Sequence, residues 1–593
     1  MKKYLGLFLI FSTLFFTSCD EELLEPFTPG AIPEEEAVQT TADLSRLMNA
    51  AYGILTPFSE IEFNSIFTDE AGIGYANGGQ GLDDNYAFLL NPSSDSANGI
   101  WDTHYITLSR VNRVIKFSAN VTPVDAADQA VFNRLLAEAY TLRAHCHLQL
   151  LAHYSTNPKD LNALGVVLSN DVFLASYVGS RVANGQIYNL IDSDLTQAEA
   201  LYATVPSADA VNPIYANKIF TTAVRARSYA LRGDYPNALI YANQVIATPG
   251  LSLSTGSTYR DMFLTDATGE TIFKIDKATG QTRIGNIWAS VNSTVSGSPF
   301  YEMGRSLFNI LNTTNLPSAT SYTVTAIAGT AITIPGHTLA VNDMFVSTQN
   351  VPSNATYNGA GTGTVPANSL VAGKVYFVRS VSGNNITLTD SYNGTTNINF
   401  SAANGPSLSI PVKTNDGDVR YSTMVHPTSI IDFNYQSSSD FRNTDKIAIR
   451  KYPGAGTNGN LVNDIKICRL SEMYLIKAEA EIAAGNLTAA ATTIQTLRNA
   501  RFNKVQPLPV YANATDAWKA VLQERRIELA FEGFRYVDLK RIGSLAGETI
   551  SRDSQDCAFN GACSLPLTDF RFTMPIPQDE TNANGGIQQN PGY

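Results

Sequence analysis

The sequence predicts a mainly α-helical protein that carries a small inserted all-β module, and three observations lead to this fold class. Apolar residues recur every three or four positions through most of the chain, which is the period of an amphipathic helix. Two segments, 219–250 and 472–501, share an Ala-rich helix, a Gly-Asp or Gly-Asn turn and a second helix. Between residues 318 and 413, alternating Thr, Val and Ile with turn signals such as Asn-Gly replace the helical period.

The helical pattern starts at Thr41, after a linker punctuated by prolines. Further long helices are expected over 98–118, 132–155 and 186–203. The two similar segments follow the tetratricopeptide pattern, in which small residues, here Ala238 and Ala489, let paired helices approach closely. Repeats of this kind build a scaffold.

The first 18 residues are typical of a secretory signal peptide, with two lysines, a short apolar run and then small residues. Cys19 directly follows Phe-Thr-Ser and resembles the cysteine of a bacterial lipobox, which is acylated after cleavage. Residues 19–40 are therefore expected to form a lipidated tether that holds the protein to a membrane. The alternative is an ordinary secreted protein in which Cys19 has no such role.

Charge and cysteine spacing limit the function classes. A net charge of −12 and a pI near 5.1 argue against nucleic acid as a partner, because phosphate binding needs clustered Lys and Arg. Cys557 and Cys563 flank a short turn-like segment in an exported chain, so we expect a disulfide. Cysteine and histidine spacings fit no zinc site, and we expect neither a metal nor a cofactor.

The stretch from Gln523 to Gly543 is rich in charge, and it raises the question of catalysis. Glu528 and Glu532 lie one helical turn apart among arginines, with the apolar residues of the stretch on one stripe of the same helix. A glycosidase needs two carboxyls of different pKa across a cleft, whereas carboxylates beside arginines stay ionised. We therefore predict ion pairs that fix a helix to its neighbours, and no enzyme activity.

Three segments together resemble the SusD/RagB family of outer-membrane lipoproteins of Bacteroidetes. They are DIKICRLSEMYLIKAEAEIAAGNLTAAATTIQTLRNAR (464–501), ERRIELAFEGFRYVDLKRIG (524–543) and FTMPIPQDETNANGGIQQNPGY (572–593). The resemblance implies a helical domain over 41–317 and 414–593 on tetratricopeptide-like units with long loops, interrupted by the β module at 318–413. It also implies a lipoprotein on the extracellular face that captures oligosaccharide and acts as the lid of a SusC-like TonB-dependent transporter. The alternatives are RagB-like peptide uptake, a surface glycosidase and an adhesin.

The family holds its ligands on irregular loops laid over the helices, and sugars stack on aromatic faces beside amide and acidic groups. Two loops have this composition: 68–90 and 280–304. The residues that we expect to contact ligand are Tyr75, Asn77, Asp83 and Tyr86 in the first loop, and Asn286, Trp288 and Tyr301 in the second. Trp288 fits a core position equally well.

Overall fold

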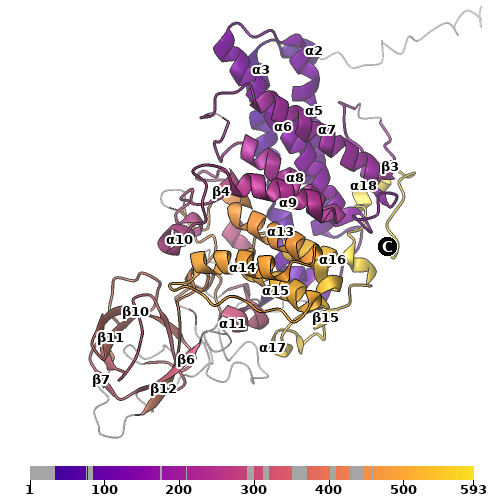
Figure 1. Ribbon diagram of the computed structural model, residues 1–593. Coiled ribbons are helices and arrows are strands. Elements are labelled where there is room, and N and C mark those ends of the chain that lie inside the picture. Colours follow the sequence, from indigo (N-terminus) through magenta and orange to yellow (C-terminus); the bar gives the residue numbers. More distant parts are fainter. Residues whose placement is uncertain are drawn as a thin grey trace, which may run out of the picture.

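The computed structural model describes residues 34–74, 77, 84–173, 177–208, 210–289, 299–311, 319–349, 370–400, 409–427, 429, 447–455 and 459–593. A helical body makes up most of the molecule, and a β module lies at one end of it (Figure 1). The first described helix, α2 (Glu34–Ala37), lies at the opposite end from that module. The predicted fold class, mainly α with a small β module, is confirmed.

Long helices form the N-terminal part of the body, and they cover the segments in which the helical period is strongest. They are α3 (Thr41–Ile54), α4 (Phe58–Phe67), α5 (Asp95–Phe117), α6 (Ala126–Tyr154) and α7 (Asn184–Tyr202). Side chains that bond to free amides mark two of the starts: Thr40 and Asp43 form a capping box on α3, and Asp125 caps α6. Within the described residues, no helix is both long and apolar enough to span a bilayer.

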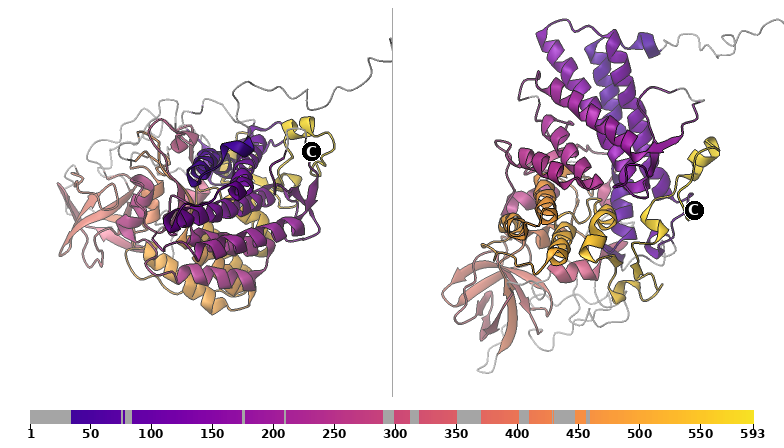
Figure 2. Two further views of the ribbon diagram at one scale, coloured as in Figure 1. Left: turned by 90° about the horizontal axis from the view of Figure 1, so that it is seen from above. Right: turned by 45° about the vertical axis from the view of Figure 1, so that its right-hand side comes forward.

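Two helical hairpins follow the repeat pattern. They are α8 (Lys218–Arg232) with α9 (Tyr235–Ile246), and α13 (Leu470–Ala483) with α14 (Leu487–Arg501). In each turn a glycine adopts positive φ, 80° at Gly233 and 76° at Gly485, and the next residue caps the second helix. Helix α9 packs against α13, so the hairpins stack (Figure 2). Ala238 is fully buried as expected, whereas Ala489 of the second hairpin is half-buried and its neighbour Ala490 is fully buried.

The charge-rich stretch is divided between two helices, α15 (Ala514–Glu528) and α16 (Arg535–Ala546). The expectation of a single helix with one apolar stripe is therefore wrong. Phe531 and Gly533 have φ of 61° and 85°, which no α-helix accommodates. Tertiary contacts stabilise this turn, since the Phe531 amide donates to a carboxylate oxygen of Glu70 at 3.2 Å.

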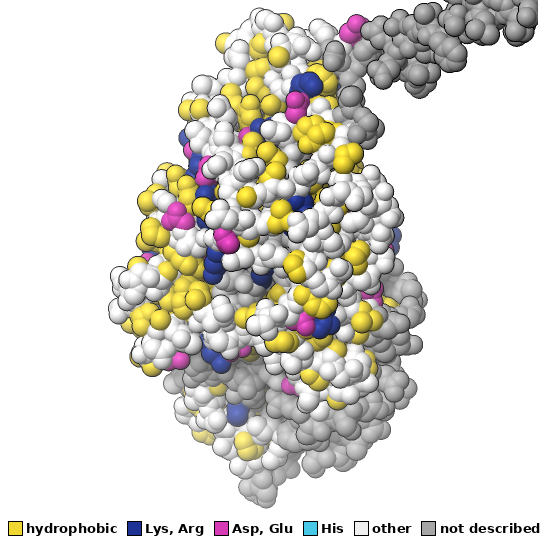
Figure 3. Space-filling model, turned by 90° about the vertical axis from the view of Figure 1, so that its right-hand side faces the viewer, with side chains coloured by type: hydrophobic (Ala, Val, Ile, Leu, Met, Phe, Trp, Pro, Cys, Tyr) yellow, Lys and Arg dark blue, Asp and Glu magenta, His cyan; other side chains and the backbone are white. Residues whose placement is uncertain are grey.

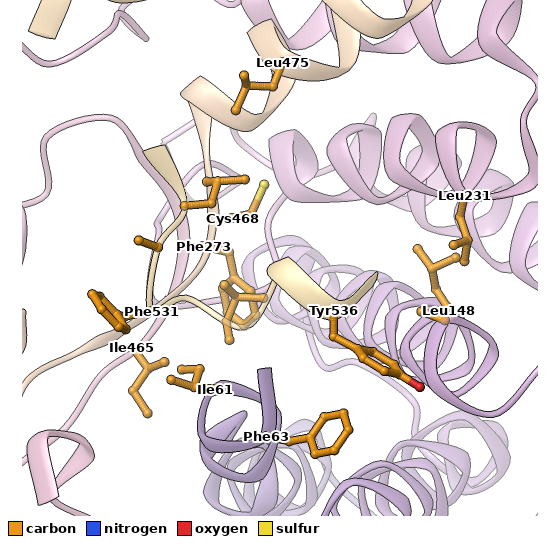
Figure 4. Packing of buried hydrophobic residues seen from close by; sticks show 14 of the residues in the cluster. Ile61, Phe63, Leu148, Leu231, Phe273, Ile465, Cys468, Leu475, Phe531 and Tyr536 are labelled. Carbon is orange, nitrogen blue, oxygen red and sulfur yellow. The ribbon is translucent and has the colours of Figure 1, made fainter. Parts of the chain in front are cut away.

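The main core lies where these helices meet two short strands, β4 (Thr271–Ile275) and β13 (Ile465–Arg469), which pair antiparallel. Figure 4 shows Phe63 of α4 beside Tyr536 of α16, and Phe273 of β4 close to Cys468 of β13. The Phe63 and Tyr536 ring centroids are 5.0 Å apart at 74°. This edge-to-face contact joins the N-terminal helices to the C-terminal ones.

The β module is one seven-stranded antiparallel sheet of order β6-β12-β9-β10-β11-β8-β7. Its strands are β6 (Thr320–Val324), β7 (Ala326–Ala328), β8 (Ala331–Thr333), β9 (Met344–Ser347), β10 (Val375–Ser382), β11 (Asn385–Thr389) and β12 (Ile410–Asn415). Successive side chains of a strand point to opposite faces. Phe345 and Tyr376 thus enter the module's own core, while Met344 and Phe377 enter the core of the helical body. The module is packed firmly onto the body.

Candidate functional site

The two predicted ligand loops lie side by side, although they are far apart in the sequence. Strand β1 (Ala71–Ile73) pairs antiparallel with β5 (Tyr301–Met303), with Ile73 opposite Tyr301. The amide of Gly74 then donates to the carbonyl of Phe300 at 2.9 Å. A Cβ on Gly74 would stand 2.2 Å from the carbonyl oxygen of Pro299, so only glycine allows the loops to come this close.

The described candidates gather around this pairing. The Asn77 side-chain amide donates to the Phe300 carbonyl at 3.2 Å, and Asn77 is buried. The rings of Tyr86 and Tyr301 are 6.5 Å apart, and both residues are buried. Asn286, on the short helix η4 (Ile284–Ile287), is exposed. Tyr75 and Asp83 lie outside the described residues.

Trp288 packs in the core, which is the alternative that the sequence left open. Trp288 is 2% exposed. Its ring stacks on that of Tyr452 with the ring centroids 6.1 Å apart, and it meets the Phe531 ring edge-on at a centroid distance of 5.3 Å. The Trp288 carbonyl accepts the Phe300 amide at 2.9 Å. Trp288 thus supports the second loop from the core side. Its contact with a ligand stays a prediction.

A third segment, which the sequence reading did not connect with the site, contacts both loops. It contains α17 (Ser554–Cys557) and a disulfide between Cys557 and Cys563. The buried carboxylate of Asp556 accepts the Arg305 amide at 2.8 Å and pairs with its guanidinium group. The Tyr86 hydroxyl donates to the Asp556 carbonyl. The spacing of the cysteines marks the segment in the sequence, but its neighbours are not visible there.

Carboxyl groups surround the buried tyrosines on the α4 side. Burial raises the pKa of Glu62 to about 7, and the carboxylates of Asp84 and Asp95 add to this rise. Burial, together with Glu62 and Asp84, raises the pKa of Tyr301 to about 12. Tyr301 thus stays a neutral hydrogen-bonding group at physiological pH. Amides, a phenol and carboxyls can together satisfy the hydroxyls of a polyol.

An open groove of about 620 Å³ lies away from these loops, at the C-terminal ends of α7 and α9. Its lining is largely apolar, with Val205, Val211, Ile219 and Val245 among its residues. Lys218 supplies the charge on this lining. Among its described lining residues, Gln244 supplies a side-chain amide but none supplies a carboxyl group, so the loop face, where amides and carboxyls gather, is the better candidate.

Comparison with known proteins supports the fold and the family. The SusD family model matches residues 384–593. A SusD superfamily protein from Bacteroides thetaiotaomicron has the same fold over 93% of this chain and 100% of its own, with a TM-score of 0.63 and 19% identity. The C-terminal part of the chain thus matches the SusD family, and the fold is that of a SusD superfamily protein.

Two proteins described as sugar binding or laminarin binding have the same fold. A putative sugar binding protein from Bacteroides vulgatus superposes with a TM-score of 0.60 at 18% identity, covering 94% of this chain and 99% of that one. A laminarin binding SusD-like protein gives a TM-score of 0.54 at 16% identity over 94% of this chain and 100% of that one. At these identities the likeness concerns the fold alone.

Two SusD-like proteins of Formosa agariphila match parts of the chain. P2 is 32% identical over 155 residues, 24% of this chain and 29% of its own length. P38 is 24% identical over 273 residues, 45% of this chain and 50% of its own length. The matched regions span half or less of these relatives.

The charge-rich stretch forms an internal ionic network, as its composition predicts. Glu528 accepts from Arg469 at 2.9 Å and from Arg501 at 2.9 Å, and Glu532 from Arg469 and Lys451 at 2.8 and 2.6 Å. All of these side chains are buried. Burial opposes ionisation of Glu528, but Arg501 and Arg469 hold its pKa below the ordinary value. The network is structural, and it connects Glu528 at the end of α15 with Arg469 of β13 and Arg501 of α14.

The histidines of α6 are also internal. His145, His147 and His153 are buried, and the His147 ring contacts the Arg143 carbonyl at 2.9 Å and the Ser169 amide at 3.2 Å. Burial lowers the pKa of His147 to about 3 and that of His153 to about 4, so both are neutral. Among the described residues, no three metal-binding side chains lie together.

Charged side chains are sparse on the face shown in Figure 3, and both signs are intermingled there. This agrees with the low charged fraction of the whole chain, 16%. Most arginines named above are buried in the body. A face of this kind suits an uncharged ligand better than a polyanion.

Proposed function

We propose that this protein is a SusD-family, surface-exposed lipoprotein that binds an oligosaccharide at the paired loops and delivers it to a SusC-like TonB-dependent transporter, acting as its lid. The single observation that carries the proposal is the β1–β5 pairing. It fixes two irregular loops, rich in aromatic and amide side chains, on a rigid helical scaffold. We propose further that the protein binds its ligand without cleaving it.

The wider family context supports an oligosaccharide over other ligands. Two proteins of the same fold are described as sugar binding and laminarin binding. The intermingled surface charge and the Asn, Tyr and carboxyl groups of the loops fit a neutral polyol. A peptide is the second ligand class to test, because the resemblance to the RagB branch includes peptide uptake.

The chain organisation that we propose follows from the same role. Residues 1–18 are the signal peptide, 19–40 the tether acylated on Cys19, 41–317 and 414–593 the SusD-like domain, and 318–413 the insert. This would place the protein on the extracellular face of the outer membrane. Replacing Cys19 with Ala should move the protein from the membrane fraction to the soluble fraction, and unchanged anchoring would rule out the tether.

The test of the function is a binding screen on the full chain purified in mild detergent. Neutral oligosaccharides from laminarin, starch, xylan and mannan, and a peptide library, are applied in parallel, and both retention and product release are measured. We expect retention of an oligosaccharide with no product. Sugar release would indicate a glycosidase, and retention of peptides alone would indicate the RagB-like alternative. Co-purification of a large β-barrel partner from native membranes tests the transporter role.

A further inference from the structure

A narrow pocket lies where the β module meets the helical body, between the start of β10 and α12 (Val419–Met424), and we call it the junction pocket. Lys374 lines it from the module, and Arg450 lines it from the body, with His426 as a further basic side chain. Within the described residues, no carboxylate lies within ion-pair distance of Lys374 or Arg450. Two cations thus line the pocket without a paired acid.

Arg450 is half-buried, and the protein uses only part of its hydrogen-bonding capacity. Nη1 donates to the Ser422 carbonyl at 3.0 Å, and this is the one hydrogen bond that the described part of the chain gives to the guanidinium group, which has five N–H donors. Burial and the nearby Arg260 lower the pKa of Arg450 to about 10, whereas Asp390 opposes the shift. Charged groups removed from water are normally paired, so this group favours an anion.

The charges around the junction pocket do not balance. Burial lowers the pKa of the Lys374 ammonium, and Asp390 again opposes the shift. Because Asp390 is exposed, water and salt screen part of its effect on the two cations. Arg260 of α10 (Gly256–Leu264) lies near Arg450, and Asp261 pairs with Arg260 at 3.0 Å. Three permanent cations therefore face two carboxylates, and the surplus positive charge attracts an anion.

Extended backbone at 447–450 connects the junction pocket with the paired loops. On one side, the Met303 amide of β5 donates to the Ile447 carbonyl at 3.0 Å. On the other side, the Arg450 amide donates to the Met424 carbonyl at 2.7 Å. Adjacent strands lie roughly 5 Å apart and each residue advances about 3.3 Å, so Arg450 lies on the order of 10 Å from the end of β5. An oligosaccharide held at the paired loops can therefore reach Arg450.

Aromatic packing fixes the walls of the junction pocket. The Tyr421 ring of α12 lies 6.0 Å from that of Phe308 in α11 (Arg305–Leu311) and 6.3 Å from that of Phe377 in β10. Helix α11 follows β5, and it lies at the same end of the body as the module (Figure 1). The pocket has a volume of about 10 Å³, which is room for one water-sized group. It can thus admit one oxygen of an anionic group, while the rest of that group stays at the mouth.

We propose that the junction pocket binds the carboxylate or sulfate group of an acidic sugar unit through Arg450 and Lys374, within an oligosaccharide that the paired loops hold. This rests on the proposed oligosaccharide function and makes its ligand class more specific. Arginine suits the role, because its fixed fork of N–H donors matches the oxygens of such a group. With space for one group, the pocket fits a mainly neutral chain that carries single acidic substituents. The β module contributes to this specificity through Lys374.

The first experiment measures binding of matched glycan pairs to the full chain by isothermal titration calorimetry at fixed ionic strength. One pair is glucuronoxylan and its carboxyl-reduced, neutral form, and the other is lightly sulfated laminarin and laminarin. We expect the wild type to bind the acidic member of a pair at least about tenfold more tightly, the lower end for a charge-assisted hydrogen bond. The two pairs distinguish a carboxylate from a sulfate ligand.

Variants assign this preference to the junction pocket. Arg450→Gln should abolish the preference, Arg450→Lys should keep part of it because the charge remains, and Lys374→Gln should reduce it by about threefold, as for a partly exposed charge. The control is Arg379→Gln, which removes a cation of β10 that does not line the pocket and should keep the full preference. All four variants should bind the neutral glycans as the wild type does.

If the wild type binds both members of each pair equally well, the anion site is overturned while the proposed function stands. A preference that survives in Arg450→Gln overturns the site as well. If the wild type binds no glycan, the proposed function fails, and the role of the pocket within an oligosaccharide site fails with it. A second measurement then decides whether the pocket itself binds an acidic sugar.

The second measurement is the Tm of the full chain with sodium glucuronate, a sulfated glucose, inorganic sulfate or glucose, all at equal ionic strength. A ligand that binds only the native state raises Tm. We expect glucuronate or the sulfated glucose to raise the Tm of the wild type and of Arg379→Gln, but not that of Arg450→Gln. An equal rise in Arg450→Gln would be a general salt effect and would overturn the site. A response to inorganic sulfate alone would overturn the assignment to an acidic sugar.

Discussion

Polar side chains have different roles in two regions of this protein. At the C-terminal end of α15, buried carboxylates and cationic side chains neutralise each other. Glu528 accepts from two arginines, and Glu532 accepts from Arg469 and Lys451. At the β1–β5 loop face, the Asn77 amide donates to a backbone carbonyl, and burial raises the pKa of the nearby Glu62 carboxyl to about 7. The comparison teaches that charges in the interior network serve the fold, whereas we propose that the amides and carboxyls of the loop face bind a ligand.

The largest effect should come from breaking the interior network. Glu528→Ala removes one of the two carboxylates that Arg469 and Arg501 share in the interior and leaves them Glu270, and loss of one partner of a buried ion pair typically costs about 3–5 kcal/mol of unfolding free energy. Denaturant titration measures it. The control is Glu548→Ala, which removes the exposed pair with Lys519 and should cost under about 1 kcal/mol. Equal losses in the two variants would remove the distinction between interior and surface charge.

A second test concerns the carboxyl group on the α4 side of the loop face. The pKa of Glu62 is raised from 4.5 to about 7, so the folded protein binds more protons than the unfolded chain between these values. The contribution of Glu62 to stability is therefore complete below pH 4.5 and is lost as pH rises through 7. In denaturant titrations across this pH window, Glu62→Gln should reduce the pH-dependent change in unfolding free energy by an amount on the order of 2 kcal/mol.

The pKa of Glu138 is also raised to about 7, so part of the slope should persist in Glu62→Gln. Glu138 bonds to Tyr52 at 3.0 Å, far from the loops. The double variant with Glu138→Gln should flatten the profile further. An identical slope in Glu62→Gln and wild type would mean that Glu62 titrates normally.

The third test opens the loop pairing itself. Gly74→Ala places a methyl group 2.2 Å from the Pro299 carbonyl, so the two loops must separate, at a cost of about 1–3 kcal/mol. Glycan affinity should fall more than stability does. Gly53→Ala in α3 is the matched control, because a Cβ there meets nothing within 4 Å. It should leave both quantities unchanged or raise stability slightly. Wild-type glycan affinity in Gly74→Ala would separate the pairing from the site.

The smallest effect is expected at the junction between the β module and the body. Lys504 pairs with Asp343 at 2.7 Å, but its side chain is 36% exposed. Lys504→Ala should cost less than about 1 kcal/mol, because the apolar contacts of Met344 and Phe377 hold the module. Differential scanning calorimetry checks this. A separate low-temperature transition for the module would show that charge, and not packing, fixes it.

Local sequence patterns predicted the parts of the fold that depend on near neighbours. The Gly-Asp and Gly-Asn turns, the helical hairpins and the change to β composition near residue 318 all follow from residues a few positions apart. The turn at Phe531 was missed, because it is stabilised by Glu70 from a distant part of the chain. An amphipathic pattern cannot show that a helix is interrupted for such a contact.

The candidate site shows the same limit. Composition predicted two ligand loops, 68–90 and 280–304; the structure brings the two loops together through β1 and β5, and their role in binding stays a prediction. The burial of Trp288 depends on Tyr452 and Phe531, which no local pattern links to it. The segment that contains the Cys557–Cys563 disulfide was recognised only as a pair of cysteines. Its contact with the first loop, the hydrogen bond from the Tyr86 hydroxyl to the Asp556 carbonyl, joins residues 470 positions apart.

The most direct test of the central claim is a hydrogen–deuterium exchange footprint of the full chain saturated with the oligosaccharide that it retains. Protection should appear in 68–77, 84–90, 284–303 and 552–563, with no product formed during the measurement. Protection of the apolar groove at the ends of α7 and α9, with the loops unchanged, would contradict the claim that the joined loops hold the ligand.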